Sequence, residues 1–257
     1  RRPESPLEPE HEPRSEKTAV RTATIWLVAS RKLVLRAIWL IVRKDLTVEV
    51  RSRELAYTTL FFAVSCVLVF AFSLVQEGRA AEGVGAGVLW MAIMFAGNLA
   101  LGRTFERERQ SETLRALMLV PAPRPAVYLG KLAGIVVLLA ITEAVLVPLV
   151  ALLFEAELLA HPFWLAAVVI TGTMGFAAVG TLFAAMLVRA RSRDVLLPVL
   201  LYPITVPVLI AGVRATVAIA QPEFDAEVVR FWLTLLVAFD IVFITLALWT
   251  FEPVMTD

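Results

Sequence analysis

Six apolar stretches of about 20 residues each restrict the folds that this chain can adopt. A bilayer core about 30 Å thick needs roughly 20 residues of helix at 1.5 Å per residue. Helices satisfy their own backbone hydrogen bonds in hydrocarbon. Hydrophobic residues make up 59% of the 257, which leaves too little polar surface for a large soluble protein. The sequence therefore predicts an all-α integral membrane protein. The predicted spans are 55–75, 84–102, 127–154, 163–188, 195–213 and 231–251.

The loops between these spans alternate in charge, and this predicts their orientation. Lys and Arg gather before the first span, in the loop after the second and at 189–194. The other three loops hold few basic residues, and two of them carry acidic pairs such as Glu155 with Glu157 and Glu223 with Asp225. Loops rich in Lys and Arg stay in the cytoplasm. We therefore expect both termini to be cytoplasmic.

Two further segments precede the first span. Residues 1–20 are charged and proline-rich, and such a composition predicts a disordered tail. Residues 21–54 mix Trp26, Trp39 and aliphatic residues with Lys and Arg, which predicts an amphipathic helix in the membrane interface. A seventh span at 34–42 is the alternative, but that run is too short to cross. The rest, 55–257, forms the predicted six-helix membrane domain.

The segment 103–125, on the basic side, has the composition of a docking surface. It combines apolar residues with alternating charges and ends at three prolines. An interface needs an apolar anchor within a polar rim. We expect a cytoplasmic partner to dock here, with a solvated connector as the alternative. The candidate docking residues are Phe105, Glu106, Arg107, Glu108, Arg109, Leu114 and Leu117.

Three residues with an amide or carboxyl side chain fall inside predicted spans: Asn98, Glu143 and Asp240. A charge at the bilayer centre costs about 3 kcal/mol even on lenient scales. Each carboxyl must therefore face the bundle interior, be protonated or find a donor. We favour hydrogen bonds that fix helix packing, with a role in substrate passage or gating as the alternative. The candidate partners are Thr142, Thr171, Thr173, Thr205, Tyr202 and Arg214.

Small residues recur at spacings that bring helices together. Gly83 with Gly87, and Gly130 with Gly134, each form a GxxxG pair, which permits close approach of helix backbones. Either pair could contact a second copy of the chain. Three more glycines in the fourth span predict close packing or a bend: Gly172, Gly175 and Gly180.

Several function classes are disfavoured by the sequence. Residues 129–132 contain Gly-Lys but lack the rest of a P-loop, so ATP binding of that kind is excluded. Two histidines and one cysteine give no cluster with metal-ligand spacing, so we expect no metal site. No loop pairs a nucleophile with a base, so we expect no catalytic residues. A net charge of +1 gives no nucleic-acid signal.

Short motifs follow one another in order from about residue 39 to 255. They are KDLTVE at 44–49, WMAIMFAGNLALGR at 90–103, FERER at 105–109, Pro121, LGK at 129–131, Glu143, GTMGFAAVGT at 172–181, RDVLLP at 193–198 and Phe239-Asp240. Their order resembles the ABC-2 type permeases and, within them, the haem exporter protein B (CcmB) family of cytochrome c maturation.

The resemblance implies a permease subunit in a bacterial inner membrane, without a covalently bound cofactor. It implies a homodimer that carries two copies of an ATPase subunit, CcmA. CcmA binds the ATP and docks on the segment 103–125 of the permease. The resemblance further implies the partners CcmC, CcmD and the haem chaperone CcmE, with haem as the possible substrate or ATP-driven release of the loaded chaperone. A generic ABC-2 exporter of polysaccharide, lipid or drug is the alternative. A membrane scaffold or a membrane enzyme is favoured less.

Overall fold

A computed structural model describes residues 34–74, 83–110, 124–187, 190 and 192–254. In that part of the chain, six helices are long and apolar enough to cross a membrane. They are α2 Glu54–Leu74, α3 Val84–Gln110, α5 Arg124–Leu153, α6 Pro162–Met186, α7 Arg193–Ala220 and α8 Ala226–Val254. A 3-10 turn, η1 Leu158–Ala160, precedes α6. The predicted all-α fold with six spans is therefore confirmed.

Helix ends do not coincide with the ends of the apolar runs. The second span was expected to end at residue 102, but α3 continues through 103–110. The fifth was expected at 195–213, whereas α7 extends to Ala220. Arg, Glu and Ala form helices readily in water, so a helix continues beyond the bilayer until a breaker or a tertiary contact ends it.

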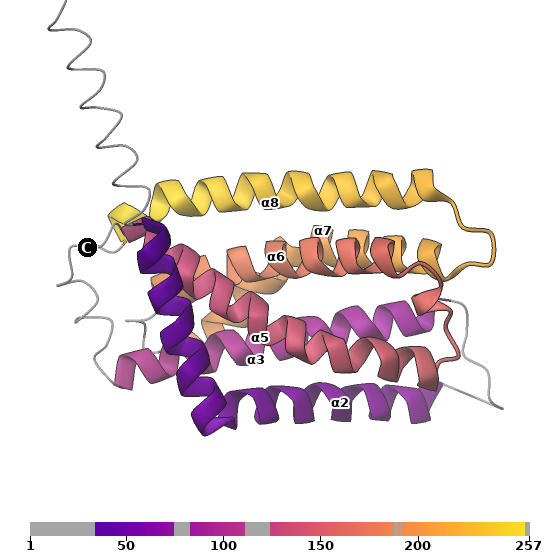
Figure 1. Cartoon of the computed structure of the whole chain (residues 1–257), viewed down its shortest axis with the longest axis horizontal. Helices are drawn as coiled ribbons and strands as arrows, with labels where there is room; N and C mark the ends of the chain where they lie inside the picture. The colour runs from indigo at the N-terminus through magenta and orange to yellow at the C-terminus, as the bar shows by residue number, and fades with distance from the viewer. Residues whose placement is uncertain (1–33, 75–82, 111–123, 188–189, 191, 255–257) are drawn as a thin grey trace, which may run out of the picture.

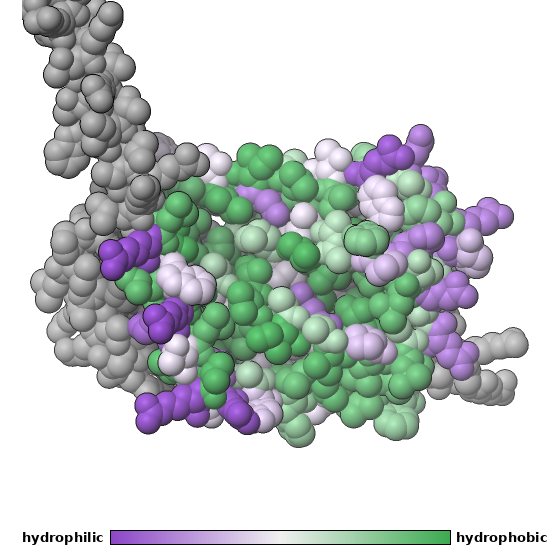
Figure 2. Space-filling view, in the orientation of Figure 1, coloured by the Kyte–Doolittle hydropathy of each residue, from purple (hydrophilic) through white to green (hydrophobic). Residues whose placement is uncertain are grey.

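The helices form a bundle of roughly parallel rods (Figure 1). The C-terminal end of α2, the N-terminal end of α3 and the α5–α6 and α7–α8 connections lie at one end, and the C-terminal end of α8 lies at the other. Apolar residues form a broad band across the visible face, with hydrophilic residues towards both ends (Figure 2). Such a band is expected of a protein whose middle faces lipid.

Residues 34–52 form a further helix, which we call the crossing helix. It lies steeply across α5 and α2, at the end of the bundle where α8 finishes (Figure 1). Residues 1–33, with the predicted tail and the start of the predicted interfacial helix, lie outside the described residues. The interfacial position stays a prediction, supported by the direction of this helix.

A sharp corner joins the crossing helix to α2. Arg53 adopts a φ of 54° there, a conformation that non-glycine residues rarely occupy. The Ala56 backbone N–H donates to Glu49 Oε1 at 2.7 Å. Glu49 thus satisfies a backbone donor in the first turn of α2, where a negative charge also suits the helix dipole.

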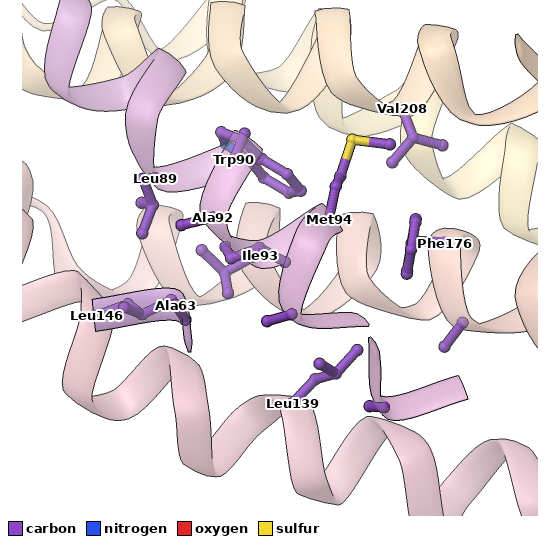
Figure 3. Packing of buried hydrophobic residues seen from close by; sticks show 14 of the residues in the cluster. Ala63, Leu89, Trp90, Ala92, Ile93, Met94, Leu139, Leu146, Phe176 and Val208 are labelled. Atoms are coloured by element: carbon purple, nitrogen blue, oxygen red, sulfur yellow. The ribbon is translucent and has the colours of Figure 1, made fainter. Parts of the chain in front are cut away.

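The centre of the bundle is built around Trp90 of α3. Its ring is 1% exposed and lies against two glycines, Gly172 of α6 and Gly212 of α7. The indole Nε1 donates to Thr216 Oγ1 at 2.9 Å. Figure 3 shows Met94 reaching towards Val208 with Trp90 on the same side of α3, while Ile93 lies on the opposite side, towards Leu139 and Leu146. The three helices therefore meet through one aromatic ring.

The other two glycines of α6 also permit close contacts. A Cβ at Gly180 would lie 2.2 Å from Leu101 Cδ1, and one at Gly175 would lie 2.5 Å from Asp240 Oδ1. Real side chains never approach so closely. The predicted close packing of this helix is therefore confirmed.

Candidate functional site

The predicted docking segment begins as a direct continuation of α3. Five of its candidate residues, 105–109, lie on this helical backbone. Leu114 and Leu117 lie outside the described residues. At the start of the extension, Arg103 Nη1 lies 3.9 Å from Glu54 Oε1 of α2. Both side chains are well exposed, so this pair contributes little stability.

A buried arginine marks the point where α3 leaves the core. Arg193, the first residue of α7, is 5% exposed, and its Nη2 donates to the carbonyl oxygen of Gly102. Its Nε lies 3.9 Å from the exposed carboxylate of Asp194. The guanidinium therefore ties α7 to α3 directly before the extension. In the sequence Arg193 was noted for loop charge and for its motif, and neither signal indicated burial.

Glu143, near the middle of α5, is buried and paired. Thr173 of α6 donates its hydroxyl to Glu143 Oε1. Three other expected donors bond to their own helices instead: Thr142 to Leu138, Thr171 to Ala167 and Thr205 to Leu201. Such back-bonding is common for threonine in helices. Arg214 is exposed, away from the buried carboxylates.

Asp240 of α8 faces inward against α6. Its side chain packs at Gly175, where a larger residue would displace it. Among the described residues, Asp240 Oδ1 has no hydrogen-bond partner. Asn98 of α3 is half-buried, and its Oδ1 likewise has none there. The three predicted intramembrane polar residues thus lie on three helices, and in the part of the chain that the structure describes no hydrogen bond or ion pair joins them.

The crossing helix is attached to α5 by contacts that sequence reasoning missed. Lys131 of α5 has only 4% of its side chain exposed and lies 2.7 Å from Asp45 Oδ2. A Cβ at Gly130 would lie 2.8 Å from Ile41 Cγ2. The face around Gly130 is therefore covered by the same chain and is not free for a second copy. At the other GxxxG pair, Gly87 has open space beside it.

A cavity of about 890 Å³ lies beside this ion pair. The crossing helix, α2 and α5 line it, together with Thr104 at the start of the α3 extension. Its walls are mostly aliphatic, with charged residues near the crossing helix: Lys44, Asp45, Glu49, Arg53 and Lys131. No sequence pattern indicated this cavity, because it arises from the angle between three helices.

His161 occupies the other end of the bundle. It precedes α6 and stacks on Phe224 with ring centroids 3.9 Å apart. Within the described ranges, no group of three or more His, Cys, Asp or Glu residues could hold a metal ion. The stacking contact with Phe224 is thus the interaction that holds the His161 ring in place.

Six spans, inward-facing polar residues and a charged helical extension at one end define a multi-pass membrane protein of the permease class. The family model described as CcmB protein matches residues 36–255. The chain belongs to this family.

Relatives in several bacteria carry the name heme exporter protein B. The Rhodobacter capsulatus protein is 28% identical over 169 residues, 66% of this chain and 77% of the relative. The Bradyrhizobium diazoefficiens protein is 24% identical over 179 residues, 70% of this chain and 80% of the relative. The Escherichia coli K12 protein is 36% identical over 94 residues, so this match spans 42% of that relative.

Proposed function

We propose that this chain is the permease subunit of a haem-export complex for cytochrome c maturation in the bacterial inner membrane. Membership of the CcmB family supports this, as do relatives named for haem export. ATP hydrolysis belongs to a separate subunit, since the sequence has no P-loop. The chain itself is therefore the membrane component of the complex and not its enzyme.

The extension of α3 is the observation that carries this proposal. A helix that continues beyond the bilayer through 103–110 presents a rigid element to a soluble partner. We assign the coupling role to 105–117, with the ATPase CcmA as the partner. Arg193 fixes the base of this element through the Gly102 carbonyl. The basic residues at this end support a cytoplasmic position for it and for both termini.

Two copies of the chain then pair with two copies of CcmA. In one copy, Trp90 and Phe176 fill the space between α3, α6 and α7, so a substrate path through that core is closed. Exposed apolar residues on α2 and α8, such as Phe72 and Trp249, leave those faces for lipid or for the second copy. CcmC and CcmD complete the complex. ATP hydrolysis drives either haem export or release of the haem-loaded chaperone CcmE.

Replacing both Leu114 and Leu117 by Asp tests the coupling assignment. Loss of an apolar anchor costs about 2 kcal/mol or more, so recovery of the ATPase with the purified permease should fall about tenfold or more. Leu159→Asp is the matched control, because Leu159 is exposed at the opposite end of the bundle. Undiminished ATPase recovery with the double variant would refute the assignment.

The haem assignment has its own test, which is co-purification from native membranes. Recovery of CcmA, CcmC and CcmD with the full chain is the expected result. Recovery of enzymes of polysaccharide synthesis in their place would instead support a generic exporter.

A further inference from the structure

The cavity beneath the crossing helix has the length of one lipid leaflet. Along α5 its lining begins at Lys131 and ends at Thr142. Eleven residues of helix at 1.5 Å each cover about 16 Å. Half of a hydrocarbon core of about 30 Å is about 15 Å. The cavity therefore runs from the level of the crossing helix to about the middle of the bilayer.

Its two ends differ in chemistry. The deep end is aliphatic and includes Leu60, Leu138 and Ile141. The shallow end carries the cations Lys44, Arg53 and Lys131 and the anions Asp45 and Glu49. The lining of the shallow end thus holds more cations than anions. An occupant that suits both ends has an acidic head and an apolar tail.

The charged residues differ in how they are engaged. Asp45 lies 2.7 Å from Lys131 and 3.1 Å from Lys44, so its carboxylate is shared by two cations. Glu49 accepts the Ala56 N–H. Arg53 stands at the exposed corner, and its Nε donates to the Val50 carbonyl at 3.4 Å. Arg53 and Lys44 are therefore the exposed cations of the lining, whereas Lys131 is buried.

We propose that this cavity is a binding site for one phospholipid with an anionic phosphodiester head. The phosphate lies near Arg53 and Lys44, and one acyl chain follows α5 towards Ile141. The lipid fills the space between the crossing helix and the spans and reaches Thr104, one residue before the coupling segment. The site does not depend on which substrate the complex exports.

Binding of phosphatidylglycerol to the full-length protein, followed by native mass spectrometry, tests the proposal. Wild-type protein should retain one molecule. Gly134→Leu should reduce retention about tenfold, because Gly134 lines the cavity and has only Asp45 atoms, at 3.8 and 3.9 Å, near its Cβ position. Gly87→Leu is the matched control, since it places the same side chain in open space away from the cavity. Equal retention by both variants would overturn the proposal.

A second pair of variants covers the case in which Gly134→Leu does not fold. Ile141 lines the deep end yet is 53% exposed, so Ile141→Trp is tolerated sterically. Val137 is exposed on the same helix and does not line the cavity, which makes Val137→Trp its control. Retention should fall for Ile141→Trp alone.

The head group is tested with Arg53→Gln and, as control, Arg51→Gln, because Arg51 is exposed two residues earlier, at the end of the crossing helix, and does not line the cavity. One basic residue near anionic lipid contributes enough for about a fivefold change in affinity. Only Arg53→Gln should show this change, and high salt should weaken binding to the wild type. A wild type that retains no lipid, or that retains haem in this cavity instead, would contradict the assignment.

Discussion

Two sides of this bundle are packed by different means. Around Trp90, α3, α6 and α7 meet through glycines. In the most apolar 18-residue stretch of α6, 72% of the residues are buried. Beneath the crossing helix, α2 and α5 border a cavity of about 890 Å³. In the most apolar 18-residue stretch of α2, only 28% of the residues are buried. The α2 span is nevertheless at least as apolar in sequence as the α6 span. The difference lies in where small residues let backbones approach.

The comparison shows what gives rigidity in a membrane protein. Lipid tails are as apolar as leucine, so hydrophobicity alone does not hold two helices together. The Trp90 side gains close van der Waals contacts and one buried hydrogen bond to Thr216. The crossing-helix side relies on the Lys131–Asp45 pair, the Glu49 cap and the contact between Ile41 and Gly130. We therefore expect substitutions to have larger effects on the first side.

The largest expected effect comes from overfilling the Trp90 side. A Cβ at Gly172 would lie 2.1 Å from Trp90 Cη2, so Gly172→Leu forces the ring or the helix to move. Overpacking of this kind costs about 3 kcal/mol or more. The yield of folded protein and its melting temperature in detergent should both fall sharply. Gly87→Leu should leave both nearly unchanged, and similar melting of the two variants would contradict the comparison.

A smaller loss is expected when the buried ion pair is broken. Lys131→Met leaves Asp45 without its buried partner, and we expect a loss of about 2 kcal/mol, below the range for fully buried pairs, because Asp45 is 21% exposed. Lys44→Met, at a side chain that is 42% exposed, should cost below about 1 kcal/mol. Adding Asp45→Leu to Lys131→Met should restore part of the stability in a double-mutant cycle. No restoration would mean that the pair does not act as a unit.

The hydrogen bond between α5 and α6 should contribute less. Thr173→Val removes the donor to Glu143, and loss of one such bond costs about 1 kcal/mol.

Glu143→Gln keeps an acceptor, so stability and cytochrome c yield per assembled complex should stay close to wild type. Asp240→Asn should behave in the same way, whereas Glu143→Leu and Asp240→Leu should lower the amount of folded protein. Intact complex with a yield near zero for either amide variant would refute a structural role.

The smallest effect is expected outside both regions, at His161. Its ring stacks on Phe224, and an aromatic pair of this kind contributes about 0.5 kcal/mol or slightly more. His161→Ala should therefore lower the melting temperature slightly and mature cytochrome c normally. Complete loss of maturation with the complex intact would show that this histidine handles haem.

The sequence predicts the spans well because the bilayer requires a similar length and a helical backbone of all of them. It also predicts that Gly172, Gly175 and Gly180 permit close packing, since glycine in a helix interior needs such a reason. Thr173 was among the named donors for Glu143, but its choice over Thr142 depends on how α5 and α6 are rotated. No local sequence pattern indicates how two helices are rotated relative to each other.

The contacts of the crossing helix were not predicted for a different reason. Lys131 and Asp45 are separated by 86 residues, and each alone resembles an ordinary charge at the edge of a membrane. Arg193 likewise stands in a basic loop, where exposure is the usual outcome. These residues become recognisable only when helices from distant parts of the chain are placed side by side.

The continuity of α3 gives it the mechanics of a stiff lever. Between Trp90 and Gln110 the helix has no proline, and it covers about 30 Å at 1.5 Å per residue. With Trp90 fixed by its neighbours, a displacement of about 3 Å at Gln110 corresponds to a tilt of only about 6°. A small movement at the membrane surface is thus carried along one continuous helix to the middle of the bilayer.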